Sequence, residues 1–256
     1  MLGIERRQAI LELIKKNRKV YVSELSKSFN VTEETIRRDL EKLEDENLVQ
    51  RSYGGAVLKE HLSEDVSFGN RAAINRVEKG RIAKRAADLI HDGDTIMLDS
   101  STTCMAFLKE LDKAGRKDIT IITNSIRLLS DFSGSESFNF ISTGGSLRKR
   151  SCALTGPVAI SSVQRYFADY TVISCRGLVI ENGILESNEE EGAIKEHMLS
   201  QGKQKILLAD HSKFNKTAFV KSSDLCSIST IVTDTIPSSE WIDFFAQNDI
   251  ELIVCD

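Results

Sequence analysis

The chain has 256 residues with a formal net charge of −4, and 41% of its residues are hydrophobic. That length suits one small and one medium domain. No apolar run approaches the roughly 20 residues that span a membrane. Arg6 and Arg7 precede an amphipathic stretch rather than the uninterrupted apolar core of a signal peptide. We therefore expect a cytoplasmic protein without a membrane anchor.

The cysteines and histidines form no pattern typical of a metal site. Five cysteines are scattered, odd in number and without C-x-x-C spacing, so they are expected to be reduced and mostly buried. The four histidines lie far apart in the sequence. We predict no structural zinc, no other metal ligand and no cofactor.

The first 30 residues predict two helices around a short extended segment. Apolar spacing marks a first helix over about residues 4–16, and residues 20–22 favour a β-strand. Ser23 is expected to cap a second helix, because its hydroxyl can accept a backbone N–H of the first turn. Asn30 can adopt the left-handed conformation that ends a helix.

A third helix is expected over residues 33–46. Thr32 is a suitable N-cap for the same reason as Ser23. Apolar residues recur at i, i+4 and i+7 from Ile36 to Leu43 and form one stripe. At about 100° per residue, Arg38 points away from that stripe. The helix can therefore dock on a small core and present its arginine outward.

After this helix, residues 48–58 predict a two-stranded hairpin whose turn has glycines where positive φ is needed. Helix, tight turn and capped helix form a helix-turn-helix, whose second helix enters the DNA major groove. With the hairpin, residues 1–58 make a winged helix-turn-helix. The residues predicted to contact DNA are Ser23, Lys27, Thr32, Thr35, Arg37, Arg38, Lys42, Arg51 and Tyr53.

Overall charge does not argue for DNA binding. Residues 1–57 hold eleven Lys/Arg and ten Asp/Glu, a net charge of +1, and the remaining 23 basic and 28 acidic residues give −5. An acidic balance repels a polyanion at long range. The alternative interpretation is an ordinary solvated helix with i,i+4 ion pairs. The placement of the arginines, together with the turn and the wing, favours DNA binding.

Two separated motifs of this segment occur in a fixed order. Residues 35–40 read Thr-Ile-Arg-Arg-Asp-Leu, and residues 51–56 read Arg-Ser-Tyr-Gly-Gly-Ala. Together they resemble the N-terminal signature of the DeoR family of bacterial transcriptional regulators, which usually has histidine in place of Tyr53. Because helix-turn-helix proteins usually bind repeated half-sites as dimers, at least a homodimer on operator DNA is expected.

Residues 59–75 are polar and are interpreted as a linker with short ordered pieces. From residue 76 to residue 256, strand and helix patterns alternate, which indicates an α/β domain with helices on both faces of a parallel or mixed sheet. Strands are predicted at 95–98, 119–122, 138–142, 170–173, 205–208, 230–232 and 251–254, and helices at about 76–90, 104–111, 125–131, 157–163, 189–201 and 238–247.

Small polar loops follow three of the predicted strands. In such sheets ligands bind beyond the carboxyl ends of the strands, and hydroxyl and N–H groups at a helix N-terminus suit an anion such as phosphate. For each loop alone, capping or turn chemistry is the more ordinary interpretation, but their coincidence favours a site for a phosphorylated small molecule. The residues predicted to bind it are Asp99, Ser100, Ser101, Thr102, Thr103, Thr123, Asn124, Ser125, Gly144, Gly145, Arg148, Lys195 and Lys213.

Residues 99–103 look like a D-S-G-T-T loop, with Ser101 in place of the glycine. This half of the chain thereby resembles the effector domain of the DeoR family, which is similar to the ribose-5-phosphate isomerase fold. Residues 174–178 depart from the smaller, Gly-rich loop usual there. Further matches to the family lie at residues 123–125, 144–148, 191–195 and 208–214.

The resemblance implies a repressor of carbohydrate-metabolism genes whose operator affinity changes when a phosphorylated sugar, or a related phosphorylated metabolite, binds the second domain. We expect no catalytic residues. Glu191 and Lys195 have the spacing of a helix ion pair, and no nucleophile elbow, Walker loop or G-x-G-x-x-G occurs. Two alternatives stay open: a sugar-phosphate isomerase or transferase with an accessory N-terminal domain, and an architectural DNA-binding protein without an effector.

Overall fold

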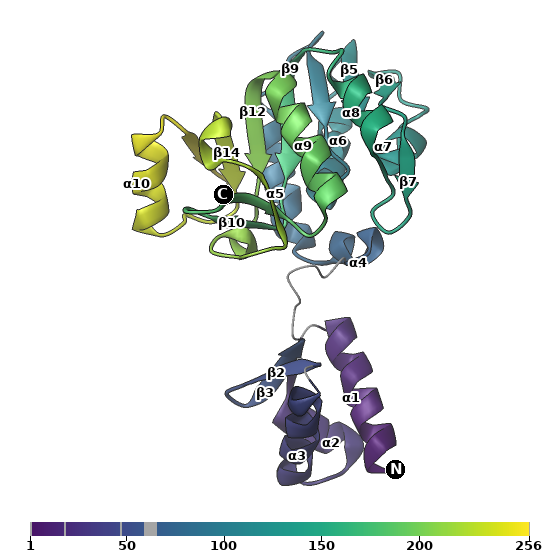
Figure 1. The fold of residues 1–256 in the computed structure, drawn as a ribbon, viewed down its shortest axis with the longest axis vertical. Coiled ribbons are helices and arrows are strands. Elements are labelled where there is room, and N and C mark those ends of the chain that lie inside the picture. Colours follow the sequence, from purple (N-terminus) through teal and green to yellow (C-terminus); the bar gives the residue numbers. More distant parts are fainter. Residues whose placement is uncertain (1, 18, 47, 59–65, 256) are drawn as a thin grey trace. The chain divides into compact units, whose positions relative to one another are not determined.

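The computed structural model describes residues 2–17, 19–46, 48–58 and 66–255. The chain divides into two units, residues 1–61 and 62–256, and both are drawn in Figure 1. Within the described residues, no helix is both long and apolar enough to cross a membrane.

The N-terminal unit is a three-helix core closed by a small antiparallel sheet with strand order β1-β3-β2. Fully buried side chains from two helices and a strand, among them Ile10, Ile36 and Val49, form its core. These contacts explain the apolar stripe of the third helix. The elements are α1 (Gly3–Asn17), β1 (Lys19–Tyr21), α2 (Val22–Phe29), α3 (Glu33–Asp45), β2 (Val49–Ser52) and β3 (Gly55–Leu58).

The start of α2 differs from the prediction that Ser23 caps it. The helix begins at Val22, its N-cap is Tyr21, and no side chain caps it. The reason is tertiary, because β1 runs directly into the helix and the Val22 N–H donates to the Gly54 carbonyl of the wing turn at 2.9 Å. Strand pairing, rather than a local hydroxyl, sets this end of the helix.

Part of the segment predicted as linker is helical. α4 (Phe68–Ala73) begins after Ser67, whose hydroxyl accepts the Asn70 N–H at 3.4 Å. Phe68 is buried, and its N–H donates to the Arg150 carbonyl at 3.0 Å. Residues 66–75 therefore pack as part of the second unit, and residues 59–65 lie outside the described residues.

The second unit is built on a seven-stranded sheet of order β15-β14-β12-β9-β4-β5-β6, in which every neighbouring pair is parallel. Since the strands are parallel, their carboxyl ends lie at one edge, as the sequence predicted. The strands are β4 (Thr95–Leu98), β5 (Ile119–Thr123), β6 (Phe138–Ser142), β9 (Ala168–Ser174), β12 (Gly202–Leu208), β14 (Thr230–Thr233) and β15 (Glu251–Val254).

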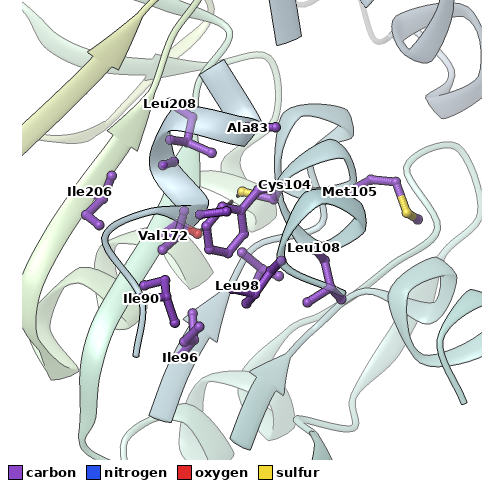
Figure 2. Packing of buried hydrophobic residues seen from close by; sticks show 14 of the residues in the cluster. Ala83, Ile90, Ile96, Leu98, Cys104, Met105, Leu108, Val172, Ile206 and Leu208 are labelled. Atoms are coloured by element: carbon purple, nitrogen blue, oxygen red, sulfur yellow. Dashed lines mark hydrogen bonds between the residues drawn. The ribbon is translucent and has the colours of Figure 1, made fainter. Parts of the chain in front are cut away.

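Helices cover both faces of this sheet (Figure 1). On one face, α5 and α6 pack on the strands through a cluster that includes Ala83, Cys104 and Val172 (Figure 2). On the other, α8, α9 and α10 contribute buried residues such as Met198 and Trp241. The helices are α5 (Arg76–Ala87), α6 (Thr102–Lys113), α7 (Ile126–Asp131), α8 (Pro157–Val163), α9 (Glu189–Gln201) and α10 (Ser239–Gln247).

Two small antiparallel sheets were not predicted from the sequence. Their strands are three or four residues long, too short for a period-two pattern to stand out. One is a hairpin, and the other has the order β10-β11-β13. The hairpin is β7 (Ser146–Arg148) and β8 (Ala153–Thr155), and the others are β10 (Gly177–Val179), β11 (Gly183–Glu186) and β13 (Val220–Ser223), with 3₁₀ turns at His211–Lys213 and Leu225–Ser227.

Candidate functional site

The turn between α2 and α3 is fixed by local hydrogen bonds. Asn30 has φ 52°, the left-handed conformation, and its N–H reaches the Lys27 and Ser26 carbonyls. Thr32 then caps α3 by accepting the Thr35 N–H at 3.3 Å. Both features were predicted, and they set the angle at which α3 leaves α2.

The outward face of α3 carries paired charges. Arg37 lies 3.0 Å from Glu33, and Arg38 lies 3.5 Å from Glu34, each pair one helical turn apart. The arginine side chains are 57% and 73% exposed, while Thr35 is half-buried. Because exposed pairs of this kind contribute little to stability, the guanidinium groups can exchange a carboxylate for another anion.

The wing lies against the same helix. Glu44 of α3 accepts the backbone N–H of Arg51 at 2.8 Å and lies 3.0 Å from its guanidinium. At the turn that follows, Gly54 has φ 82°, which only glycine adopts without strain. The neighbouring Tyr53 is completely exposed. The structure thus brings Arg51 to α3 and leaves the tyrosine at the tip of the wing.

The other predicted DNA contacts are exposed side chains of α2 and α3. Ser23 and Lys27 are exposed on α2 at i,i+4 spacing, which places them on one face of that helix. Lys42 is exposed near the end of α3. Whether these three side chains contact DNA stays a prediction.

Sequence reasoning missed the residue that anchors α3. Asp39 is 4% exposed, and its carboxylate lies 2.5 Å from Arg6 and 3.8 Å from Arg7 of α1. A buried carboxylate without a cation is costly, so this contact fixes the rotation of α3 on α1. The available signal was a charged residue beside the apolar stripe, but its partner lies 33 positions away.

In the second unit, three polar loops meet at one edge of the sheet. They follow β4, β5 and β6, which are neighbours in the strand order. The loops are residues 99–101, residues 124–125 and residues 143–145. The predicted ligand residues of these loops are therefore brought together.

Asp99 organises the first loop. It is 1% exposed, accepts the Ser101 N–H at 2.8 Å and the Ser174 N–H at 3.1 Å, and lies 3.0 Å from the Lys195 ammonium. Burial raises the pKa of this carboxyl, but the ammonium and the hydrogen bonds outweigh burial and bring the pKa below its ordinary value. Asp99 is therefore an anion that shapes the loop.

The Lys195 ammonium is held by three protein acceptors. It donates to the Ser174 carbonyl at 2.7 Å, contacts Asp99 and forms a short hydrogen bond with Glu186. Burial lowers the pKa of Lys195, but the two carboxylates raise it above the ordinary lysine value. Burial raises the pKa of Glu186 despite the neighbouring ammonium. In this arrangement Lys195 positions the loop, and direct ligand contact by it stays a prediction.

The hydroxyls of the first loop divide into two groups. Ser101 caps α6 by accepting the Cys104 N–H at 3.0 Å, and Thr103 lies 3.4 Å from the Ser174 hydroxyl. Ser100 and Thr102 are buried, and across the described segments their side chains make no hydrogen bond with protein. These two hydroxyls and the N-terminus of α6 are free to meet an anion.

The second loop is held by several hydrogen bonds. Thr123 donates to the Leu98 carbonyl at 2.7 Å and accepts the Ser125 N–H at 3.1 Å, and Ser125 caps α7. Asn124 donates to the Leu154 carbonyl at 3.1 Å. Its side-chain oxygen is buried and has no partner among the residues described, which leaves one acceptor for a ligand donor.

The third loop allows close packing of the backbone. Gly145 has φ 111°, and a Cβ there would lie 2.6 Å from the Thr155 carbonyl oxygen. The preceding Gly144 has φ 65°. Arg148, in the hairpin that follows, lies 2.7 Å from Glu191 of α9. The predicted cation is thus already paired with a carboxylate.

Lys213 approaches from the carboxyl end of β12. It lies 4.0 Å from Asp210, and burial lowers its pKa despite that carboxylate. Asp210 also accepts the Asn75 side-chain N–H at 2.8 Å. This contact ties the residue before α5 to the edge of the sheet, a link that local sequence patterns did not predict.

Comparisons with known proteins agree for both units. Residues 6–61 match the family model described as the DeoR-like helix-turn-helix domain, and residues 74–235 match the DeoR C terminal sensor domain. The chain is 40% identical to the uncharacterized HTH-type transcriptional regulator YulB of Bacillus subtilis, over 92% of this chain and 90% of that protein.

Two further relatives have more specific names. The HTH-type transcriptional repressor GlcR of Bacillus subtilis is 37% identical over 98% of this chain and 96% of its own length. The Glycerol-3-phosphate regulon repressor of Escherichia coli is 29% identical over the whole of both chains. Among solved structures, ribose 5-phosphate isomerase A from Methanocaldococcus jannaschii matches 55% of each chain with a TM-score of 0.42 and 16% identity.

Proposed function

This chain belongs to the DeoR family of transcriptional regulators, and we propose that it represses carbohydrate-metabolism genes under the control of a phosphorylated sugar. The DNA-binding part is the winged helix-turn-helix, and the sensor part is the α/β domain. Operator DNA and the sugar phosphate are its partners in this proposal, and it acts in the cytoplasm as at least a homodimer.

The observation that carries the sensor proposal is the convergence of three polar loops on neighbouring strand ends. The Ser100 and Thr102 hydroxyls, the α6 N-terminus and the free oxygen of Asn124 offer several donors and one acceptor at one edge. Phosphate suits the donors, and the hydroxyls of a sugar suit the amide oxygen. Relatives named for glycerol-3-phosphate and L-fucose regulation support the same chemical class.

The sign of regulation is proposed from the relatives. GlcR and the E. coli relative are named repressors, whereas the relative from Haemophilus influenzae is named an L-fucose operon activator. We assign repression because two of these three relatives are named repressors, and GlcR, at 37% identity, is more similar to this chain than the activator, at 32%.

Binding rather than turnover is the proposed output of the sensor site. Three residues of the site that are suited to acid–base chemistry, Asp99, Glu186 and Lys195, are buried, and the Lys195 ammonium is paired with both carboxylates. A general acid or base must reach the proton that it transfers. Relatives named as regulators favour the same conclusion.

Fluorescence anisotropy on DNA from upstream of the gene, at fixed salt and against scrambled DNA, tests both halves. A sugar phosphate from a panel should weaken selective binding by about 5- to 150-fold, the usual range of coupling free energies. Thr102→Ala should lower the response to that sugar, whereas Ser200→Ala, which changes an exposed serine near the C-terminal end of α9, should not. Selective binding that no phosphorylated sugar changes would contradict the sensor proposal.

Arg38→Ala tests the DNA half in the same assay. It should lower operator affinity by about 10-fold, since a lost base or phosphate contact costs on the order of 1–3 kcal/mol. Arg85→Ala is the matched control, because Arg85 is an exposed arginine of the second unit with a carboxylate 3.6 Å away. Equal operator affinities of the two variants would contradict the assignment of α3 to the DNA interface.

A further inference from the structure

The helix assigned to DNA reading is itself acidic. α3 holds six acidic and three basic residues between Glu33 and Asp45, a net charge of −3. The DNA backbone repels such a helix, because duplex DNA carries about one negative charge per 1.7 Å. Base edges in the major groove differ from the backbone, since the amino group of cytosine is a hydrogen-bond donor that suits a carboxylate.

Two of these carboxylates lie at the end of α3 that meets the bases. In helix-turn-helix proteins, the N-terminal residues of the second helix contact base edges. Glu33 and Glu34 form the first turn of α3, and their side chains are 49% and 63% exposed. Glu34 lies nearly opposite the buried Ile36 and Leu40 on the helix, in the same direction as Arg38.

Neither carboxylate is needed to cap the helix. The Thr32 hydroxyl accepts the N–H of Thr35, and Glu33 and Glu34 pair instead with the arginines one turn later. In the free protein each arginine is therefore neutralised by its own helix. A phosphate must replace that carboxylate at the arginine, which costs at most about 1 kcal/mol for an exposed pair but applies to DNA of any sequence.

We propose that Glu34 is a specificity-determining residue, and that it accepts a hydrogen bond from the N4 amino group of a cytosine in the operator. With thymine or guanine in the place of that cytosine, the carboxylate faces an acceptor oxygen instead of a donor, and the amino group of adenine stands beside the N7 acceptor. The inference rests on the DNA-binding function and adds the base that the helix requires. The operator half-site consequently contains a C·G pair at the position that Glu34 reaches.

The test uses the full-length protein and three steps. Selection from randomised duplexes by the wild-type protein first yields a half-site. Each C·G pair in it is then changed to T·A, and affinities of wild type, Glu34→Ala and Glu46→Ala are measured by anisotropy. Glu46→Ala is the matched control, because it removes another exposed carboxylate, at the C-cap of α3 and thus at the opposite end of the helix. Melting temperatures show that each variant is folded.

When one particular C·G pair is changed to T·A, the affinity of the wild type and of the control should fall about 10-fold, as expected for the loss of one specific base contact. Glu34→Ala should lose this discrimination and bind random duplex more tightly, with a steeper salt dependence because Arg38 is released to phosphates. The proposal would be overturned if, at every C·G pair, the change to T·A lowered the affinity of Glu34→Ala as much as that of the wild type. Failure of the wild type to select any site would instead overturn the DNA-binding function.

Discussion

The two units hold their charges in opposite ways. In the DNA-binding unit, the arginines of α3 lie on the surface, with side chains 57% and 73% exposed beside carboxylates of the same helix. In the sensor unit, Lys195 is 7% exposed and lies 3.0 Å from Asp99, whose side chain is 1% exposed. The first arrangement can exchange its partners for an incoming anion, and the second cannot.

This difference follows from the environment of each pair. Exposed ion pairs contribute about 0–1 kcal/mol, so leaving one carboxylate for a phosphate costs little. Buried charges lose hydration and require their partners, so removing one leaves an expensive unpaired charge. Exchangeable surface pairs suit DNA contact, and fixed buried pairs suit the positioning of a ligand loop.

The largest expected effect comes from Lys195→Met. It leaves Asp99 and Glu186 as buried carboxylates without a cation, which should cost the sensor unit about 3–5 kcal/mol. Lys113→Met removes an exposed lysine 2.6 Å from Glu110 and should cost less than about 1 kcal/mol. Urea denaturation followed by circular dichroism measures both losses. Equal losses of unfolding free energy in the two variants would contradict the proposed difference between buried and exposed pairs.

Core truncation should affect the two units unequally. Ile36→Ala and Ile96→Ala each remove a fully buried isoleucine, at a cost of about 2–5 kcal/mol. The N-terminal unit has about 60 residues and little reserve of stability, so Ile36→Ala should unfold it and abolish DNA binding. Ile96→Ala should leave the sensor unit folded at room temperature. Retained operator binding by Ile36→Ala would contradict this expectation.

Two N-cap residues give a smaller, matched comparison. Thr32 accepts the Thr35 N–H at 3.3 Å, and the buried Ser101 accepts the Cys104 N–H at 3.0 Å. Alanine at either position should cost about 0.5–2 kcal/mol, with the larger loss at Ser101 because water cannot replace the lost acceptor there. Thermal melts of both variants test this order, and a larger loss at Thr32 would reverse it.

The smallest effect concerns pH. A hydrogen bond to Asp234, 2.7 Å away, raises the pKa of the exposed His211. The resulting stability is fully present below the unfolded pKa of about 6.5 and is lost as pH rises through the folded value. The melting temperature of the sensor unit should therefore decrease by a small amount as the pH is raised above about 6.5. His211→Asn and Asp234→Asn should each remove this slope, and its survival in both variants would disprove the assignment.

Much of the fold was predictable because its signals are local. The left-handed Asn30, the Thr32 cap and the alternation of strand and helix patterns from residue 76 onward indicate where elements begin and end. The winged helix-turn-helix and the α/β class are confirmed. The start of α2 was missed, since a hydrogen bond to the wing turn sets it. Short strands such as β10 were missed because three residues are too few for a period-two pattern to stand out.

The candidate sites likewise combine features that local sequence predicts with contacts between distant residues. Sequence by itself determined which polar loops follow strands and which arginines point away from the core, because both follow from the periodicity of strands and helices. Only the tertiary structure decided the partners: Asp39 with Arg6, and Lys195 with Asp99 and Glu186. These contacts join residues that are distant in sequence, and burial makes the choice of partner obligatory.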